Sequence, residues 1–228
     1  DSEYIRQQTL DSIKNFIGDR AKLIISNQPN PHRRIERLQS ETQIYKGQNS
    51  SIHPNTNGAD AHFELTAQDL GIEFEKLDFW SEIRAAYLTS NPFEFSRHTE
   101  YGIASLGVDY LMTKRLLLGW STQFDLINQT GAQSNATNAK GNGWLLGPYA
   151  SYLVSPNVYL HSSMAFGGSN NQMNIFDLYE DVFTTQRSLY NAALVGFWNY
   201  NNWSYSPTIG FTYYQETLNN EVFISNSV

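Results

Sequence analysis

The residues of this chain that could carry chemistry are five histidines and the acidic side chains near them. The sequence has no HExxH pattern, no pair of histidines at helical spacing, no glycine-rich phosphate loop and no GxSxG motif. It also has no cysteine, which excludes disulfides and thiolate metal ligands. We therefore predict no catalytic residue, no metal site and no cofactor, and we do not expect an enzyme.

Two of the histidines nevertheless leave a catalytic interpretation open. His161 and Ser163 fall on one face of a predicted strand, and Asp109 falls on the polar face of another. Histidine titrates near neutral pH, so such a group could transfer protons. A histidine that only makes a hydrogen bond in a polar interior is the simpler interpretation. His98 lies between two glutamates in a predicted surface loop, but the sequence does not place its partners.

The composition restricts the class of protein. Only 16% of the 228 residues are charged, whereas soluble domains have about a quarter. No stretch approaches the roughly 18 apolar residues of a membrane helix. Low charge without an apolar run fits an outer-membrane β-barrel, in which only every second strand residue faces lipid. The net charge of −7 argues against nucleic acid as a partner.

Amphipathic segments with a period of two fill most of the chain after residue 77. The clearest is 116–127, where Trp120 and Phe124 fall on one face and Gln123 and Asp125 on the other. About seven strands are predicted in this way, over 77–88, 101–112, 116–127, 143–154, 158–167, 186–198 and 203–214. Strands of about ten to twelve residues, when tilted, have the length that spans a bilayer.

The connections between these strands alternate between tight turns and long loops. Tight turns are expected at 113–115, 155–157 and 200–202, and long connections around Pro92, at 128–142 and at 168–185. Such sorting is typical of bacterial outer-membrane barrels, and a soluble sandwich or barrel has no reason to show it. We therefore predict an all-β fold, a transmembrane antiparallel up-and-down β-barrel over residues 77–228, in the bacterial outer membrane.

The polar face of these strands carries charged residues that would be costly in lipid but not in a water-filled or plugged lumen. We expect five of them to face the lumen and contact the N-terminal helix or a passing chain: Glu82, Arg84, Asp109, Asp125 and His161. The sequence does not decide which face of the 186–198 segment points outward, because apolar residues of period two begin at Leu189 on one face and at Tyr190 on the other.

Residues 1–40 are predicted to form a linker helix followed by a basic segment. Leu10, Ile13 and Ile17 recur at helical spacing, with Arg20 on the opposite, polar face, and Pro29 ends the pattern. This helix is moderately amphipathic and is not a membrane span.

The basic run at 31–37 has two interpretations. It could be the solvated start of a helix, or it could contact an acidic lumen or anionic lipid headgroups. Residues 41–76 are rich in Asn, Ser, Gly and Gln and are predicted as a connecting loop, within which 62–66 has the pattern of a short strand.

Six segments together resemble the translocator β-domain of autotransporters, the type V secretion proteins. They are FWSEIRAAY at 79–87, ASLGVDY at 104–110, LLGWS at 117–121, LGPYASY at 146–152, residues 159–170 and GFTYYQE at 210–216. Residues 16–29 and 33–38 resemble the linker that precedes such domains. The resemblance covers most of the chain.

This resemblance implies a barrel of twelve strands with a linker helix in its pore, which carries an N-terminal passenger to the cell surface without catalysis. The implied partners are outer-membrane lipid, the barrel-assembly machinery and the covalently linked passenger. With about seven of twelve strands predicted, we expect either further C-terminal strands or an incomplete barrel whose open edges are covered by the assembly machinery. The long connection after the helix leaves open whether the helix lies in the pore.

Two other functions stay open at this point. One is a passive porin-like channel, which needs an unobstructed pore. The other is an outer-membrane barrel enzyme that acts on lipid or peptide, which needs a histidine–acid or serine–histidine site.

Overall fold

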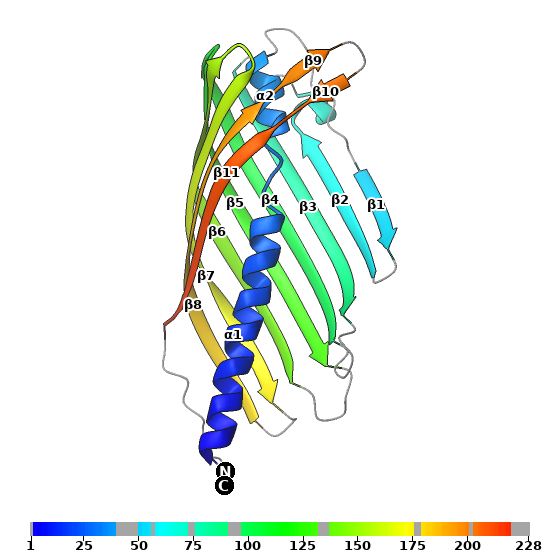
Figure 1. Cartoon of the computed structure of the whole chain (residues 1–228), viewed down its shortest axis with the longest axis vertical. Coiled ribbons are helices and arrows are strands. Elements are labelled where there is room, and N and C mark those ends of the chain that lie inside the picture. The colour runs from blue at the N-terminus through cyan, green and yellow to red at the C-terminus, as the bar shows by residue number, and fades with distance from the viewer. Residues whose placement is uncertain are drawn as a thin grey trace.

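The computed structural model describes residues 2–39, 50–55, 58–72, 76–90, 97–131, 137–175, 179–200 and 203–219. Two helices, α1 (Ser2–Ser26) and α2 (His32–Gln39), precede the strands. Figure 1 shows a tall curved sheet with α1 running along its concave side and α2 at one end.

The main sheet has nine strands in the order β1-β2-β3-β4-β5-β6-β7-β8-β11, and all neighbours are antiparallel. Its strands are β1 (Ser50–Asn55), β2 (Gly58–Thr66), β3 (Leu77–Ser90), β4 (Arg97–Thr113), β5 (Leu116–Gly131), β6 (Asn138–Ser155), β7 (Val158–Ile175), β8 (Tyr179–Gly196) and β11 (Thr208–Leu218). The remaining elements are the 3-10 helix η1 (Gln68–Leu70) and a separate hairpin of β9 (Trp198–Tyr200) and β10 (Trp203–Tyr205).

The predicted all-β, antiparallel up-and-down fold with an N-terminal helix is confirmed. From β1 to β8, each strand pairs with the next strand in the chain. The curved sheet is not closed: among the described residues, β1 and β11 are its outer strands and each pairs on one side only.

The main sheet has nine strands rather than the seven predicted, because the segment 41–76, predicted as a connecting loop, contains β1 and β2; the short strand predicted at 62–66 lies within β2. These strands are rich in Asn, Ser, Gly and Ala, so their sequences show little apolar alternation. β2 instead pairs with β3 along its whole length, from Gly58 opposite Leu88 to Thr66 opposite Trp80. Backbone pairing to an existing edge can outweigh weak strand propensity.

Two of the predicted long loops are also largely strand. β5 and β6 extend into 128–142, and β7 and β8 extend into 168–185, where they pair as far as Ile175 opposite Tyr179. These strand ends are mostly polar, and their few apolar residues, such as Met173 and Phe183, do not form a regular alternation, so the period-two pattern ends the strand too early. Conversely, the predicted strand at 203–214 is divided into β10 and β11, with Pro207 between them; proline cannot donate to a strand ladder.

The predicted sorting of connections holds only in part, because the connection after β7, at the end of the sheet away from α2, spans just residues 176–178. The tight turns after β4 and β6 lie at the end of the sheet near α2, and the longer connections after β3 and β5 lie at the other end. However, the connections 67–76 and 197–207, at the α2 end, are long as well.

The two faces of the sheet have opposite character, as the alternation predicts. On β5, Trp120 is 56% exposed on the convex face, whereas Leu117 and Asp125 are 0% and 4% exposed on the concave face. The ambiguity of β8 is resolved in the same way, because Tyr190 faces outward and Leu189 is buried. Large apolar side chains cover the convex face, among them Phe79, Ile83, Leu106, Trp120, Phe124, Trp144, Leu146, Leu160, Met164, Phe166, Tyr190, Leu194, Ile209 and Phe211.

The core lies between the helices and the concave face. Ile13 and Phe16 of α1 pack with Ile127, Met173 and Phe183 at the end of the sheet away from α2. Further along α1, Ile24 packs against Leu145 and Leu189. At the opposite end, Ile35 and Leu38 of α2 pack with Trp80, Leu117, Tyr149, Tyr159 and Val195. Among the residues that the structure describes, no helix is both long enough and apolar enough to cross a membrane.

Candidate functional site

The buried face of α1 differs from the predicted one. Ile13, Phe16 and Ile24 are each 1% exposed, and so is Arg20, which was predicted on the solvent face. The helical spacing is as expected, but the buried stripe is rotated so that it includes the arginine. Helical periodicity alone assigns a cation to solvent, and only the carboxylates of the sheet make its burial favourable.

Arg20 belongs to a buried group of four charges. Its Nε lies 3.3 Å from Asp125 Oδ1, and its Nη1 donates to Asn171 Oδ1 at 2.6 Å and lies 3.5 Å from Glu216 Oε1. Arg187 of β8 binds the same two acids, with Nη1 donating to Asp125 at 2.6 Å and Nε to Glu216 at 3.1 Å. Two cations and two anions thus balance in a space from which water is largely excluded.

Neutral side chains complete this four-charge group. Thr185 donates to Glu216 Oε1 at 2.6 Å, and Tyr214 donates to Glu216 Oε2 at 2.7 Å. Gly143 leaves space for the guanidinium of Arg187, which would overlap any Cβ at this position. The acids are therefore oriented by several donors, and the linker arginine enters a site that the sheet has already formed.

A second charged group joins α2 to β3 and β4. Arg33 donates to Asp109 and also to Asp78 Oδ2 at 3.1 Å. Arg37 binds Asp109, lies 3.3 Å from Asp78 and donates to the Lys76 carbonyl oxygen at 3.2 Å. Of the two interpretations of the basic run, contact with acidic side chains of the interior is the one observed.

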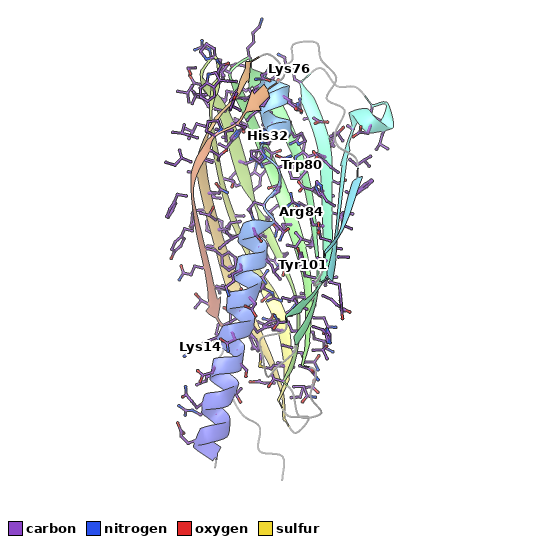
Figure 2. The ribbon with its side chains drawn as sticks, turned by 45° about the vertical axis from the view of Figure 1, so that its right-hand side comes forward. Lys14, His32, Lys76, Trp80, Arg84 and Tyr101 are labelled. Carbon is purple, nitrogen blue, oxygen red and sulfur yellow. The ribbon has the colours of Figure 1, made fainter. Side chains whose placement is uncertain are left out.

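Aromatic rings orient Asp109. Tyr149 Oη donates to Asp109 Oδ2 at 2.9 Å and accepts from Trp80 Nε1 at 2.8 Å. The two rings lie over glycines of the adjacent strands: a Cβ at Gly107 would overlap Trp80, and one at Gly119 would overlap Tyr149. Figure 2 shows Trp80 close to α2, at the same end of the sheet as Lys76.

A third contact lies at the segment between the two helices. The Asn30 backbone N–H donates to Glu82 Oε2 at 3.2 Å. Glu82 Oε1 accepts from Arg84 Nε at 2.7 Å and lies 3.0 Å from His62 Nε2. Figure 2 shows Arg84 further from α2 than Trp80. Glu82 therefore contacts the linker directly, whereas the contact of Arg84 is with Glu82.

His161 does not join the group that was considered for catalysis. Its Nδ1 lies 2.6 Å from Ser151 Oγ, and its ring stacks on Tyr159. Asp109 is occupied by the arginines of α2 and by Tyr149. Among the residues that the structure describes, the His161 imidazole therefore has a hydroxyl partner and no acid partner.

His98 contacts Tyr87: its Nδ1 lies 2.9 Å from Tyr87 Oη, and the two rings stack. Of the two neighbouring glutamates, Glu94 lies outside the described residues. Within the described part of the chain, no three His, Cys, Asp or Glu side chains are grouped so as to hold a metal ion.

Several site residues escaped the sequence analysis. Arg20 was assigned to solvent, Arg33 and Arg37 were left with two interpretations, and Glu216 was not singled out. One signal in the sequence points to them: inward-facing acids on several strands require cations, and the linker at 1–40 supplies five arginines, three of which bind acids of the sheet. The sequence does not say which arginine meets which acid.

No protein-family model matches this chain, and no curated protein sequence matches it.

Proposed function

We propose that this chain is the translocator and anchor region of an autotransporter, which holds an N-terminal linker in an outer-membrane barrel and displays the passenger that the linker carries. The observation that carries the proposal is the pair of N-terminal helices bound inside an up-and-down sheet whose convex face is apolar. In this proposal, lipid, the barrel-assembly machinery and the passenger are the partners. The protein acts by transport and anchoring, without catalysis.

The convex face supports contact with hydrocarbon. Its exposed residues include Trp120, Phe124 and Phe166, each about half exposed, in the middle portions of long strands. In a soluble monomer, an apolar patch of this extent would promote aggregation. Polar residues replace these side chains toward the end of the sheet away from α2, where Asn128 faces Lys140 and Lys140 faces Gln172 across neighbouring strands. An apolar band that gives way to a polar rim is what a bilayer requires.

The direction of the linker supports display at the surface. α1 begins at the end of the sheet that carries the longer connections after β3 and β5 and the short connection after β7, and the chain reaches α2 at the end with the tight turns after β4 and β6. In outer-membrane barrels the shorter turns face the periplasm and the longer loops face outward. A passenger that precedes α1 would therefore leave the barrel on the outer side.

The charged groups suit a linker that stays in place after export. Arg20, Arg33 and Arg37 each bind at least one buried acid of the sheet. Removing one partner of a buried ion pair costs several kcal/mol. Withdrawal of the linker would therefore be unfavourable, because it would leave these acids buried without their cations. The proposed role of Asp109, Asp125 and their neighbours is to retain the linker, which also fills the interior and disfavours a passive channel.

An epitope test in the full-length protein addresses the orientation. One epitope is placed immediately before α1, and a second in the tight turn between Lys114 and Arg115. On intact cells of a Gram-negative host, an antibody should bind the first epitope and not the second; after permeabilisation it should bind both. Binding in the opposite sense on intact cells, or only after permeabilisation for both sites, would contradict the proposal.

A matched pair of substitutions on β5 addresses the lipid contact. Phe124→Arg and Asn128→Arg both place an arginine on the convex face of the same strand, the first in the apolar band and the second in the polar rim. We expect Phe124→Arg to cost about 2–4 kcal/mol of folding free energy in lipid vesicles, and Asn128→Arg about 0–1 kcal/mol. Urea titrations in vesicles measure both. Equal costs would mean that a face of another protein, rather than lipid, covers the band.

A further inference from the structure

A small, partly open cavity lies beside the segment that connects α1 to α2. Its volume is about 30 Å³, enough for one water-sized particle. The polar residues that line it are Gln28, Arg34, Ser105, Ser121, Thr122, Gln123 and Ser163. They come from the linker and from β4, β5 and β7, so the cavity lies between the linker and the concave face of the sheet. None of the side chains that line it is a carboxylate.

Arg34 is the unusual residue of this cavity. Its neighbours on α2, Arg33 and Arg37, both bind Asp78 and Asp109. Arg34 is only 8% exposed and stacks on the ring of Tyr149 at 4.0 Å. Within the described residues, the structure gives its guanidinium no hydrogen bond and no ion pair. A buried guanidinium with five donors and no anion is costly.

Arg34 nevertheless keeps its charge. Burial lowers the pKa of its guanidinium to about 10, from the ordinary value of 12.5, so it stays protonated at neutral pH. Asp109 and Glu82, the two carboxylates that attract the Arg34 guanidinium most strongly, already bind other arginines. Among the described residues, no carboxylate forms a direct ion pair with this guanidinium, and Asp109 and Glu82 attract it only from a greater distance.

The side chain of Gln123 independently indicates that the cavity holds a hydrogen-bond acceptor. Its side chain is 7% exposed, and its Nε2 is buried without a hydrogen-bond partner in the structure. The three serine hydroxyls in the lining can rotate to donate as well. Buried donors without partners mark the position of something that accepts hydrogen bonds.

We propose that this cavity binds one small inorganic anion of the size of chloride, held between the Arg34 guanidinium, the Gln123 amide and the serine hydroxyls. The positive charge and the excess of donors select an anion over a neutral water molecule, and the small volume favours a monatomic ion. The anion neutralises the arginine that the acids of the sheet leave unpaired. It thereby joins the linker to β4, β5 and β7 at the point where α1 ends. This site goes beyond the proposed translocator function and does not depend on it.

Chloride-35 NMR on the detergent-solubilised full chain tests the site in solution. Chloride is titrated against gluconate at constant ionic strength, and the protein-dependent broadening of the chloride line reports binding. Arg34→Met, which keeps the length of the side chain but removes its charge, should weaken binding by about tenfold or more. The control Arg6→Met removes an exposed arginine of α1 whose partner is Glu3, 3.9 Å away, and should leave the broadening unchanged.

Crystals soaked in bromide place the ion. We expect an anomalous peak in the cavity of the wild-type protein within hydrogen-bond distance of Arg34 and Gln123. If Arg34→Met does not fold, Gln123→Leu replaces it in both experiments and should reduce chloride broadening and bromide occupancy. An ordered water with no bromide peak in the wild-type cavity, or chloride broadening equal in wild type and Gln123→Leu, would overturn the proposal.

Discussion

Replacing Arg187 by methionine is expected to lower the free energy of unfolding by about 3–5 kcal/mol. The Arg187 side chain is fully buried and binds Asp125 and Glu216, whose side chains are 5% and 1% exposed. Methionine fills much of the volume but leaves Arg20 as the remaining cation of the four-charge group. One buried carboxylate would then have to lose its charge or draw water inside.

Urea unfolding in lipid vesicles, followed by tryptophan fluorescence, measures this loss. The matched control is Arg115→Met, the same chemical change on an exposed residue of the β4–β5 turn, which should cost less than about 0.5 kcal/mol. The double variant Arg187→Met/Glu216→Gln removes one charge of each sign and should recover part of the stability, because the two residues act as a coupled pair. A single variant as stable as the control would show that the group adds little to folding.

Replacing Asp109 by asparagine is expected to release α2 from the sheet while the sheet remains folded. Asp109 is fully buried and is the common acceptor for Arg33, Arg37 and Tyr149. Asparagine has almost the same shape but no charge, so Asp78, which is 15% exposed, would have to serve both arginines. We expect local opening of α2 to become easier by about 2 kcal/mol or more, a population change of about 30-fold.

Limited trypsin digestion reports this opening, because trypsin cleaves after arginine and needs an unfolded segment. Cleavage after Arg33 and Arg37 should accelerate by about 30-fold if it follows the open population. Asp11→Asn is the control: it removes the same charge from an exposed site on α1, where the partner is Gln7 at 3.3 Å, and should leave the cleavage rate in α2 unchanged. Unchanged cleavage in Asp109→Asn would mean that apolar packing of Ile35 and Leu38 alone retains α2.

The two groups differ in what they hold. In the four-charge group, Arg187 of β8 binds acids of two other strands, Asp125 of β5 and Glu216 of β11. Loss of this group should therefore destabilise the whole sheet. The Asp109 group joins a short helix to two strands, so its loss should stay local. Measuring global unfolding and trypsin cleavage on both variants separates the two effects. Arg187→Met should have the larger effect on the free energy of global unfolding, and Asp109→Asn the larger effect on the rate of cleavage in α2.

The sequence by itself determined the presence of the six long strands β3 to β8, the two faces of β3 to β7 and the extent of α1. A half-buried strand and an amphipathic helix are local patterns: the alternation of Trp120 with Ser121, or the spacing of Ile13 and Ile24, needs no knowledge of distant residues. The same alternation put Glu82, Asp109, Asp125 and His161 on the inner face. It fails where apolar residues are too few to alternate regularly, which is why β1, the first half of β2 and the ends of β7 and β8 were predicted as loops.

Only the tertiary structure decided which charges meet. Asp125 and Arg187 come from β5 and β8, strands separated by two others, and the curvature of the sheet brings their side chains together. Arg20 reads as a solvent residue in the helix because its burial depends on acids more than a hundred residues away in sequence. The unpartnered guanidinium of Arg34 has the same cause: its neighbours on α2 occupy the available carboxylates, a result of helix phase and sheet register that no local pattern contains.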